Sequence, residues 1–304
     1  MNQDNNLSHY ENADDEIDLR EIFDVFWSQK RLIVICTALA SIIALMYSLY
    51  LPNKYTSKAL LAPTQQSESI SNSLSSISGL ASLAGVSMPS SSAGNITEEA
   101  WETLSSFAFF KDNILPNIFL PDLMAVKSCD AKTNTLSYKQ DLYDITDNKW
   151  EVIPSAQLAF TVYQEIFTKS RDTKTGFTTI SIKHQSPYVA RAWLDSIVSA
   201  INKQFRQDQK IRASLSIEYL NKQIAKTSYT EIQQELSALI QQETEKLMLV
   251  EANQDYIFKE IDPPIVPELK SEPQRAFICI FGFLMGGILG LLLALGKHYL
   301  RENN

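Results

Sequence analysis

Two uncharged apolar stretches decide the fold of this 304-residue chain: L-I-V-I-C-T-A-L-A-S-I-I-A-L-M-Y-S-L-Y (Leu32–Tyr50) and A-F-I-C-I-F-G-F-L-M-G-G-I-L-G-L-L-L-A-L (Ala276–Leu295). A helix rises about 1.5 Å per residue, so each stretch reaches about 30 Å, the thickness of a bilayer's hydrocarbon core. Two such spans place both termini on one side of a membrane and the long polar region between them on the other.

The orientation follows from basic residues near the spans. Lys30 and Arg31 precede the first stretch, and Lys297 and Arg301 follow the second, as expected of cytoplasmic tails. The opposite ends are also flanked by basic residues, but a loop of this length translocates regardless of charge. We therefore expect short tails inside and the large domain outside. The first stretch is long and follows acidic residues, which favours an anchor over a cleaved signal peptide.

Composition excludes several classes of protein. The net charge is −8 and no basic stripe appears, which argues against a nucleic-acid partner. Cys36 and Cys279 lie in the apolar stretches and Cys129 is alone between them. The sequence therefore predicts neither a disulfide within the loop nor a cysteine metal site.

The N-terminal part contains two ambiguous segments. Residues 1–16 are polar and predicted to be disordered, whereas Glu16–Trp27 fits an amphipathic helix on the membrane surface or an extension of the span helix. Lys54–Pro63 is predicted to be a strand. Residues 64–99 are rich in serine, which favours a flexible loop, although their apolar residues also fit a helix that orders on contact with a partner.

The middle of the chain changes from mixed to helical patterns. Thr97–Phe110 suits a helix, and Lys149–Pro154 and Phe177–Lys183 suit strands, which together predict a small mixed sheet near the membrane. Ser186 and Pro187 suit the N-cap and first turn of a helix, and after them no Gly or Pro interrupts the helical pattern up to about Ile224. A second helical pattern covers Thr230–Phe258.

The two long helical segments predict a hairpin that turns near Lys226–Thr230. Its polar helices carry only a narrow apolar seam, so they are marginal alone and require neighbours in the chain or in other copies. The predicted fold class is α+β: two transmembrane helices flank an α/β base domain that carries a long projecting helical hairpin.

Small residues recur at four-residue steps in both spans. Such stripes let helix backbones approach closely in a membrane. The sequence does not tell whether the stripes meet within one copy or between copies. The predicted packing residues are Gly282, Gly286, Gly290 and Ala294 in the second span and Cys36, Ala40, Ala44 and Ser48 in the first.

A proline-rich segment, D-P-P-I-V-P-E-L-K-S-E-P-Q-R (Asp262–Arg275), precedes the second span. Proline fixes φ and favours an extended polyproline II conformation, so this segment is predicted to be a stiff strut between domain and span. Its prolines are Pro263, Pro264, Pro267 and Pro273.

The sequence carries none of three common catalytic motifs. The chain lacks G-x-x-x-x-G-K-[ST], G-x-S-x-G and H-E-x-x-H. His184 is interpreted as a surface residue at a strand end, and the pair Glu98 and Glu99 as first-turn helix charges. We expect no catalytic residue, no metal and no cofactor.

Two motifs resemble the Wzz-type chain-length determinants, the kinase-free polysaccharide co-polymerases of bacterial inner membranes. One is D-Y-I-F-K-E-I-D-P at Asp255–Pro263, and the other is the P-x-x-P-E-x-K-S-x-P-x-R-A pattern at Pro264–Ala276, followed by a glycine-rich span. The resemblance implies an inner-membrane protein with two spans, cytoplasmic termini and a periplasmic domain.

The same resemblance implies a non-catalytic ring of identical copies that sets the modal length of a surface polysaccharide such as lipopolysaccharide O-antigen. The implied partners are a Wzy-type polymerase, the nascent polysaccharide or its lipid carrier, and membrane lipid. A subunit of a capsule or exopolysaccharide export complex is the alternative. A transmembrane sensor is disfavoured by the short tails, and a glycan-acting enzyme by the lack of a carboxylate pair.

The expected organisation has seven parts. They are the cytoplasmic tail 1–31, the first span 32–51, the periplasmic α/β base domain 52–185 with its serine-rich loop 64–95, the helical region 186–260, the proline-rich strut 261–275, the second span 276–296 and the cytoplasmic tail 297–304.

Overall fold

The computed structural model describes residue 27 and residues 29–64, 96–130 and 133–302. The predictions for residues 1–16, for the helix leading to Trp27 and for the serine-rich segment fall almost entirely outside these residues. Two compact units divide the chain: Met1–Pro52 joins Pro273–Asn304 in one, and Asn53–Glu272 forms the other.

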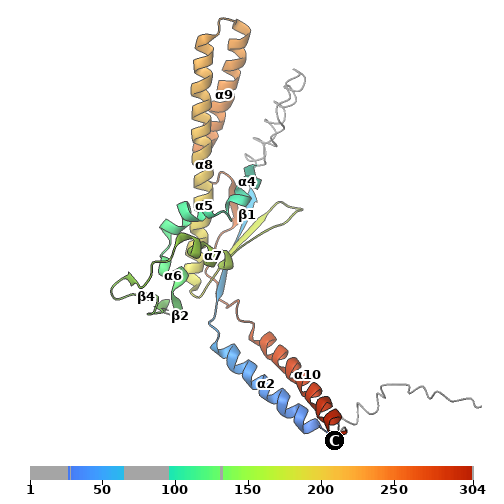
Figure 1. Ribbon diagram of the computed structural model, residues 1–304. Helices are drawn as coiled ribbons and strands as arrows, with labels where there is room; N and C mark the ends of the chain where they lie inside the picture. The colour runs from blue at the N-terminus through green and yellow to red at the C-terminus, as the bar shows by residue number, and fades with distance from the viewer. Residues whose placement is uncertain (1–26, 28, 65–95, 131–132, 303–304) are drawn as a thin grey trace, which may run out of the picture. The chain divides into compact units, whose positions relative to one another are not determined.

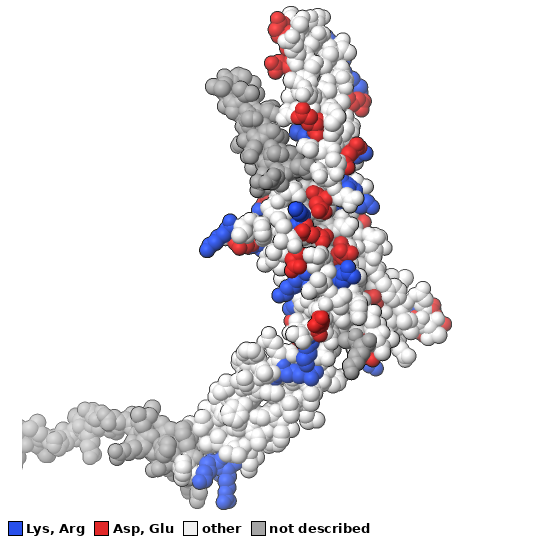
Figure 2. Space-filling view, turned by 180° about the vertical axis from the view of Figure 1, so that it is seen from behind, with Lys and Arg blue, Asp and Glu red and all other residues white. Residues whose placement is uncertain are grey.

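The first unit contains two long apolar helices, α2 (Lys30–Tyr50) and α10 (Arg275–Glu302). Their most apolar windows reach a mean hydropathy of 2.4 and 2.6, and both helices are long enough to cross a membrane. The two helices lie side by side (Figure 1). On the face seen in Figure 2, charged side chains occur only near the ends of this pair. Helix α10 continues past residue 296 into the segment expected to be a tail.

A four-stranded sheet organises the second unit. Its strands are β1 (Tyr55–Pro63), β6 (Phe167–Arg171), β7 (Thr178–His184) and β8 (Phe258–Asp262), in the order β6-β7-β1-β8. Every pairing is antiparallel, so the predicted mixed sheet is wrong in that respect. The buried positions of β7 alternate along the strand, as expected when one face of a sheet is covered.

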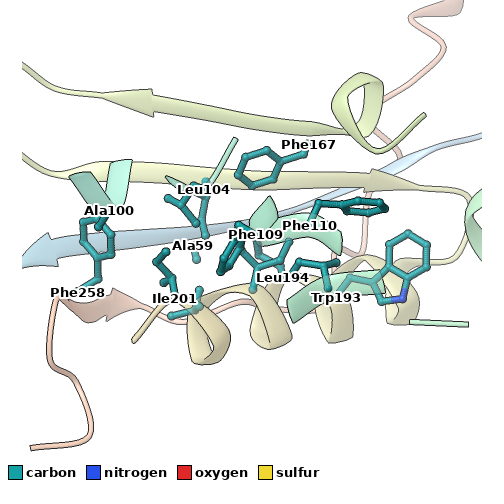
Figure 3. Packing of buried hydrophobic residues seen from close by; sticks show 14 of the residues in the cluster. Ala59, Ala100, Leu104, Phe109, Phe110, Phe167, Trp193, Leu194, Ile201 and Phe258 are labelled. Atoms are coloured by element: carbon teal, nitrogen blue, oxygen red, sulfur yellow. The ribbon is translucent and has the colours of Figure 1, made fainter. Parts of the chain in front are cut away.

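Helix α8 (Pro187–Lys226) covers the sheet and creates the main core. Leu194 and Ile201 of α8 face Ala59 of β1, and Phe109 and Phe110 fill the space beside them (Figure 3). All five are at most 1% exposed. Helix α7 (Ala156–Ile166) adds Tyr163, whose ring stacks on that of Phe167 with centroids 5.2 Å apart.

The helix predicted over Thr97–Phe110 is broken in the structure. Helix α4 (Ile96–Thr103) ends before a serine pair, and Ser106 begins α5 (Phe107–Phe109) by accepting a hydrogen bond from the Phe109 N–H at 3.1 Å. Serine side chains compete for backbone groups, which explains the break. The π-helix η1 (Phe110–Ile114) and the 3-10 helix η2 (Leu115–Asn117) follow directly.

A small lobe connects these helices to α7. It contains α6 (Leu120–Met124) and two hairpins built from β2 (Val126–Asp130) with β3 (Thr135–Tyr138) and β4 (Tyr143–Asp144) with β5 (Lys149–Trp150). The predicted strand Lys149–Pro154 is therefore shortened to two residues, and it lies outside the main sheet.

The predicted helical hairpin is present. Helix α8 has 40 residues, which corresponds to about 60 Å, and α9 (Thr230–Ala252) runs back beside it (Figure 1). The prediction of helix up to Phe258 is wrong, because the chain leaves α9 after Ala252 and residues from Phe258 pair with β1 as strand β8. The α+β class with two apolar terminal helices and a long hairpin is confirmed.

Candidate assembly surfaces

Helices α2 and α10 meet along the predicted small residues within a single copy. A methyl group built on Gly286 would lie 2.6 Å from the Ala40 Cβ, and one on Gly282 would overlap the Ala44 Cβ. Ala294 is fully buried. Since Gly282 lies opposite Ala44 and Gly290 opposite Ile33, the two helices run antiparallel.

The row on α2 differs from the stripe read in the sequence. The atoms nearest to a methyl group built on Gly290 belong to Ile33, and those nearest to one on Gly286 belong to Ala40 and Thr37. Cys36 is not among the nearest neighbours of either glycine. A strict four-residue row drifts around a helix that has 3.6 residues per turn, so a straight contact alternates steps of four and three. Only the alternating pattern identifies Ile33 and Thr37.

The proline-rich segment runs beside the start of β1. Lys54 donates its N–H to the Glu272 carbonyl at 2.9 Å, and the Ser271 N–H donates back to the Lys54 carbonyl at 2.8 Å. Thr56 and Ser271 are joined through their hydroxyl groups at 2.7 Å. We call this set of contacts the clip, because it fastens together the two segments of the unit that continue into α2 and α10.

The prolines of the segment differ in environment. Pro264 is buried, Pro267 is half-buried and Pro263 is exposed. Arg191 of α8 donates to the Pro264 carbonyl at 3.3 Å, and Ser57 donates to the Ile265 carbonyl at 2.8 Å. The segment is therefore held against the domain along its length. Pro273 belongs to the other unit, where it is half-buried.

A lysine and a glutamate reinforce the clip. The Lys183 ammonium of β7 lies 2.7 Å from the Glu272 carboxylate. The hydrogen bond from Lys183 lowers the pKa of Glu272 below its ordinary value, despite the opposing effect of burial. The two side chains are 36% and 40% exposed, so this pair contributes less than the backbone hydrogen bonds.

Helix α8 has two different halves. Its proximal half, Pro187–Phe205, buries apolar side chains in the core, among them Leu194, Ile197 and Ile201 at 0% exposure. Its distal half, Arg206–Lys226, presents the row Ile211, Leu215 and Tyr219 at 58%, 60% and 61% exposure. These three residues lie four apart and share one face of the helix. On α9, Ile232 and Leu239 are also exposed.

Asn202, which the sequence reading did not single out, fixes the edge of the sheet. Its Oδ1 accepts hydrogen bonds from the N–H groups of Ile257 and Phe258, both at 3.0 Å, and its Nδ2 donates to the Phe258 carbonyl at 2.8 Å. The residue is 5% exposed. Its position directly after Ile201, on a helix whose apolar residues are buried, is the only signal in the sequence, and the neighbouring Gln204 makes it ambiguous.

His184 is buried, so its interpretation as a surface residue is wrong. The ring Nδ1 accepts the Ser186 N–H at 2.9 Å, which leaves Nε2 to donate to the Asp122 carbonyl at 2.9 Å. Burial lowers the pKa of His184, so the ring is neutral. Both ring nitrogens are occupied by backbone groups, and the side chain ties α6 to the junction between β7 and α8.

The remaining titratable groups have structural positions. Glu98 and Glu99 lie in the first turn of α4, as predicted, and Glu98 pairs with Arg171 of β6. Burial raises the pKa of the Cys129 thiol, which keeps it protonated, and the three cysteines are free. Within the described residues no group of three His, Cys, Asp or Glu side chains is placed to hold a metal ion.

Comparisons with known proteins identify a family and many similar structures, among them two polysaccharide co-polymerases. Residues 15–108 match the model of the family described as Wzz, chain length determinant protein. A full-length bacterial polysaccharide co-polymerase matches 94% of this chain and 99% of its own, at 16% identity and a TM-score of 0.40. A fragment of WzzB, the polysaccharide co-polymerase from Salmonella Typhimurium, matches 72% of this chain and 100% of its own, at 14% identity and a TM-score of 0.30.

A comparison with curated proteins gives no match. The family match covers the first span, strand β1 and helix α4. The two motifs from which the resemblance was predicted lie elsewhere, between Asp255 and Ala276. The family match therefore confirms the resemblance of this chain to the Wzz chain-length determinants from a separate part of the sequence.

Proposed function

We propose that this protein is a non-catalytic scaffold of several identical copies in the inner membrane, where it sets the length of a surface polysaccharide such as O-antigen. In this proposal both termini are cytoplasmic and residues 52–275 lie in the periplasm. A Wzy-type polymerase extends the polymer while held beside the scaffold, together with the polymer or its lipid carrier.

The observation that carries the proposal is the exposed apolar face on the distal half of α8. Ile211, Leu215 and Tyr219 form one exposed apolar row on a helix that extends beyond the sheet. Complete burial of an exposed apolar side chain contributes about 1.5–3 kcal/mol. A monomer leaves more than half of that contribution unused at each of these three positions, which are 58–61% exposed. Neighbouring copies that pack along this row would complete the hairpin and produce an assembly.

The clip and the helix pair suit a scaffold because each joins segments that are far apart in the sequence through close contacts. Backbone hydrogen bonds between Lys54 and the pair Ser271 and Glu272 join the beginning and the end of the periplasmic unit. Close contact at Gly282, Gly286 and Gly290 holds α10 against α2. His184, the buried histidine of this unit, has both ring nitrogens bound to backbone groups, which favours a structural role over proton transfer.

The test is polymer length in a strain that lacks the gene and carries it back on a plasmid. We expect a narrow length distribution on a gel with the wild-type protein and a broad distribution with an empty plasmid. The total amount of surface polymer should change little. A normal length distribution without the protein, combined with loss of surface polymer, would contradict length control and favour a subunit of an export complex.

A further inference from the structure

A polar groove lies between the proximal half of α8 and the segment η1–η2, which packs on that helix. Its volume is about 550 Å³, within the range of small-molecule pockets. Small residues of α8, among them Ser196 and Ser199, leave this space open between the two elements. The groove lies entirely within the Asn53–Glu272 unit.

The π-helix η1 presents polar groups to the groove. Phe110 and Ile114 at its two ends are buried, whereas Asp112 is exposed and Asn113 half-buried. Asn113 donates to the Gln204 Oε1 at 2.9 Å, and Asn117 donates to the Asn113 carbonyl at 2.7 Å. Both amides are thereby oriented by the protein. Turns of π-helix are frequent at functional sites.

Three charged side chains of the groove make no side-chain hydrogen bond or ion pair within the described part of the chain: Asp112, Asp195 and Lys203. The groove thus offers carboxylate oxygens that accept, an ammonium group that donates, and the hydroxyl groups of Ser196 and Ser199, which do both. A sugar ring carries hydroxyl groups that donate and accept on adjacent carbons, and it matches such a lining.

The charges of the groove limit the class of ligand that it can bind. Its lining contains two carboxylates and one ammonium group. Burial raises the pKa of the nearby Glu260 carboxyl, and the negative charge of Asp195 raises it further. A phosphate or an acidic sugar would be repelled by this excess of negative charge. A neutral or amino sugar would not be.

We propose that the groove between α8 and η1–η2 binds a short, non-acidic stretch of the polysaccharide whose length the protein sets. This inference rests on the proposed function, because that function supplies the polymer. It assigns the contact to sugar rings in the periplasmic unit, and not to the phosphate groups of a lipid carrier.

The test uses full-length protein in nanodiscs. The probe is the oligosaccharide of a few repeat units released by mild acid from the surface polysaccharide of the host strain, titrated by saturation-transfer NMR. Ser199→Trp fills the groove, and Ser214→Trp places the same side chain at an exposed site farther along α8. We expect saturable binding by wild type, at least tenfold weaker binding by Ser199→Trp, and a change within twofold for Ser214→Trp.

Two further measurements keep the test decisive. Lys203→Met removes the donor and its positive charge without adding bulk, and it should weaken binding severalfold even if Ser199→Trp fails to fold. Inorganic pyrophosphate should not compete with the oligosaccharide. The inference is overturned by absent or non-saturable wild-type binding, by wild-type affinity in both groove variants, by competition from pyrophosphate, or by a Ser199→Trp particle of altered mass, which would make the groove an interface between copies.

These outcomes are separate from the proposed function. The deletion strain with its wild-type plasmid tests length control without reference to the groove. Length control together with wild-type affinity in both groove variants would exclude the groove as the binding site and would leave the proposed function intact.

Discussion

The proximal and distal halves of α8 belong to one uninterrupted helix but obtain their stability in different ways. Leu194 and Ile201 in the proximal half are fully buried against the sheet, whereas Leu215 and Tyr219 in the distal half are about 60% exposed. A helix of this length is not stabilised by its own propensity but by the apolar surface it buries. The apolar face of the proximal half is buried by its own chain, whereas the apolar face of the distal half needs another copy of the protein to bury it.

The largest expected effect comes from truncating a leucine in the proximal half. Leu194→Ala removes a fully buried side chain from the core, so we expect the free energy of unfolding to fall by about 2–5 kcal/mol. Urea unfolding of the full-length protein in detergent, followed by circular dichroism, measures it.

Leu215→Ala is the matched control, because it makes the same substitution at a 60% exposed site on the same helix. Measured at detergent and protein concentrations at which the particle is a single copy, its effect on the free energy of unfolding should stay within about 0.5 kcal/mol. Equal losses in the two variants would show that the two halves do not differ as described.

The next effect concerns the junction between the halves. Asn202→Ala leaves the N–H groups of Ile257 and Phe258 and the Phe258 carbonyl without their side-chain partner, at a cost of about 2–3 kcal/mol. Asn221→Ala is the control, since Asn221 is exposed and donates only within its own helix. Hydrogen exchange should show β8 opening in the first variant and not in the second. Unchanged protection of β8 would remove Asn202 from its assigned role.

The helix pair allows a smaller, sharper comparison between adjacent glycines. Gly286→Ala places a methyl group 2.6 Å from the Ala40 Cβ, whereas nothing lies within 4 Å of the corresponding position at Gly287. Overpacking of this kind costs about 1–3 kcal/mol, so the thermal midpoint in detergent should fall for Gly286→Ala. It should not fall for Gly287→Ala. The same loss in both variants would indicate helix propensity or lipid contact instead of packing between α2 and α10.

The smallest effect is a pH dependence at His184. Burial lowers the pKa of this ring in the folded state, so its neutral form contributes stability above the unfolded value of about 6.5. That contribution is lost as the pH falls from there through the folded pKa. The urea midpoint of wild type should therefore fall between pH 8 and pH 5 by more than that of His184→Asn. A parallel fall in both proteins would assign the pH dependence to other groups.

The sequence predicts the long elements of this fold well because their patterns are local. The span helices, β1 and the hairpin follow from uninterrupted apolar or helical periodicity, and Ser186 caps α8 as its position before Pro187 suggests. Strand β8 was missed because Phe258–Asp262 pairs with β1, a partner nearly two hundred residues earlier. No local pattern contains that information.

The surfaces were predicted in part. The glycine stripe of the second span follows from residue spacing alone, whereas Ile33 and Thr37 become apparent only once the two helices are paired. His184 was misread because a histidine at a strand end is usually exposed, and here Asp122 and Ser186 cover it. The sequence does not predict the polar groove, because its two sides, η1–η2 and α8, are far apart in the chain.

The mass of the full-length particle in nanodiscs tests most directly the claim that neighbouring copies complete the distal half of α8. We expect a particle of several copies for wild type and for Asn221→Ala, a substitution at an exposed site on another face of the same half. We expect a smaller particle for Leu215→Lys, with the circular dichroism spectrum of the folded protein retained. A wild-type particle of one copy, or an unchanged mass for Leu215→Lys, would contradict that claim.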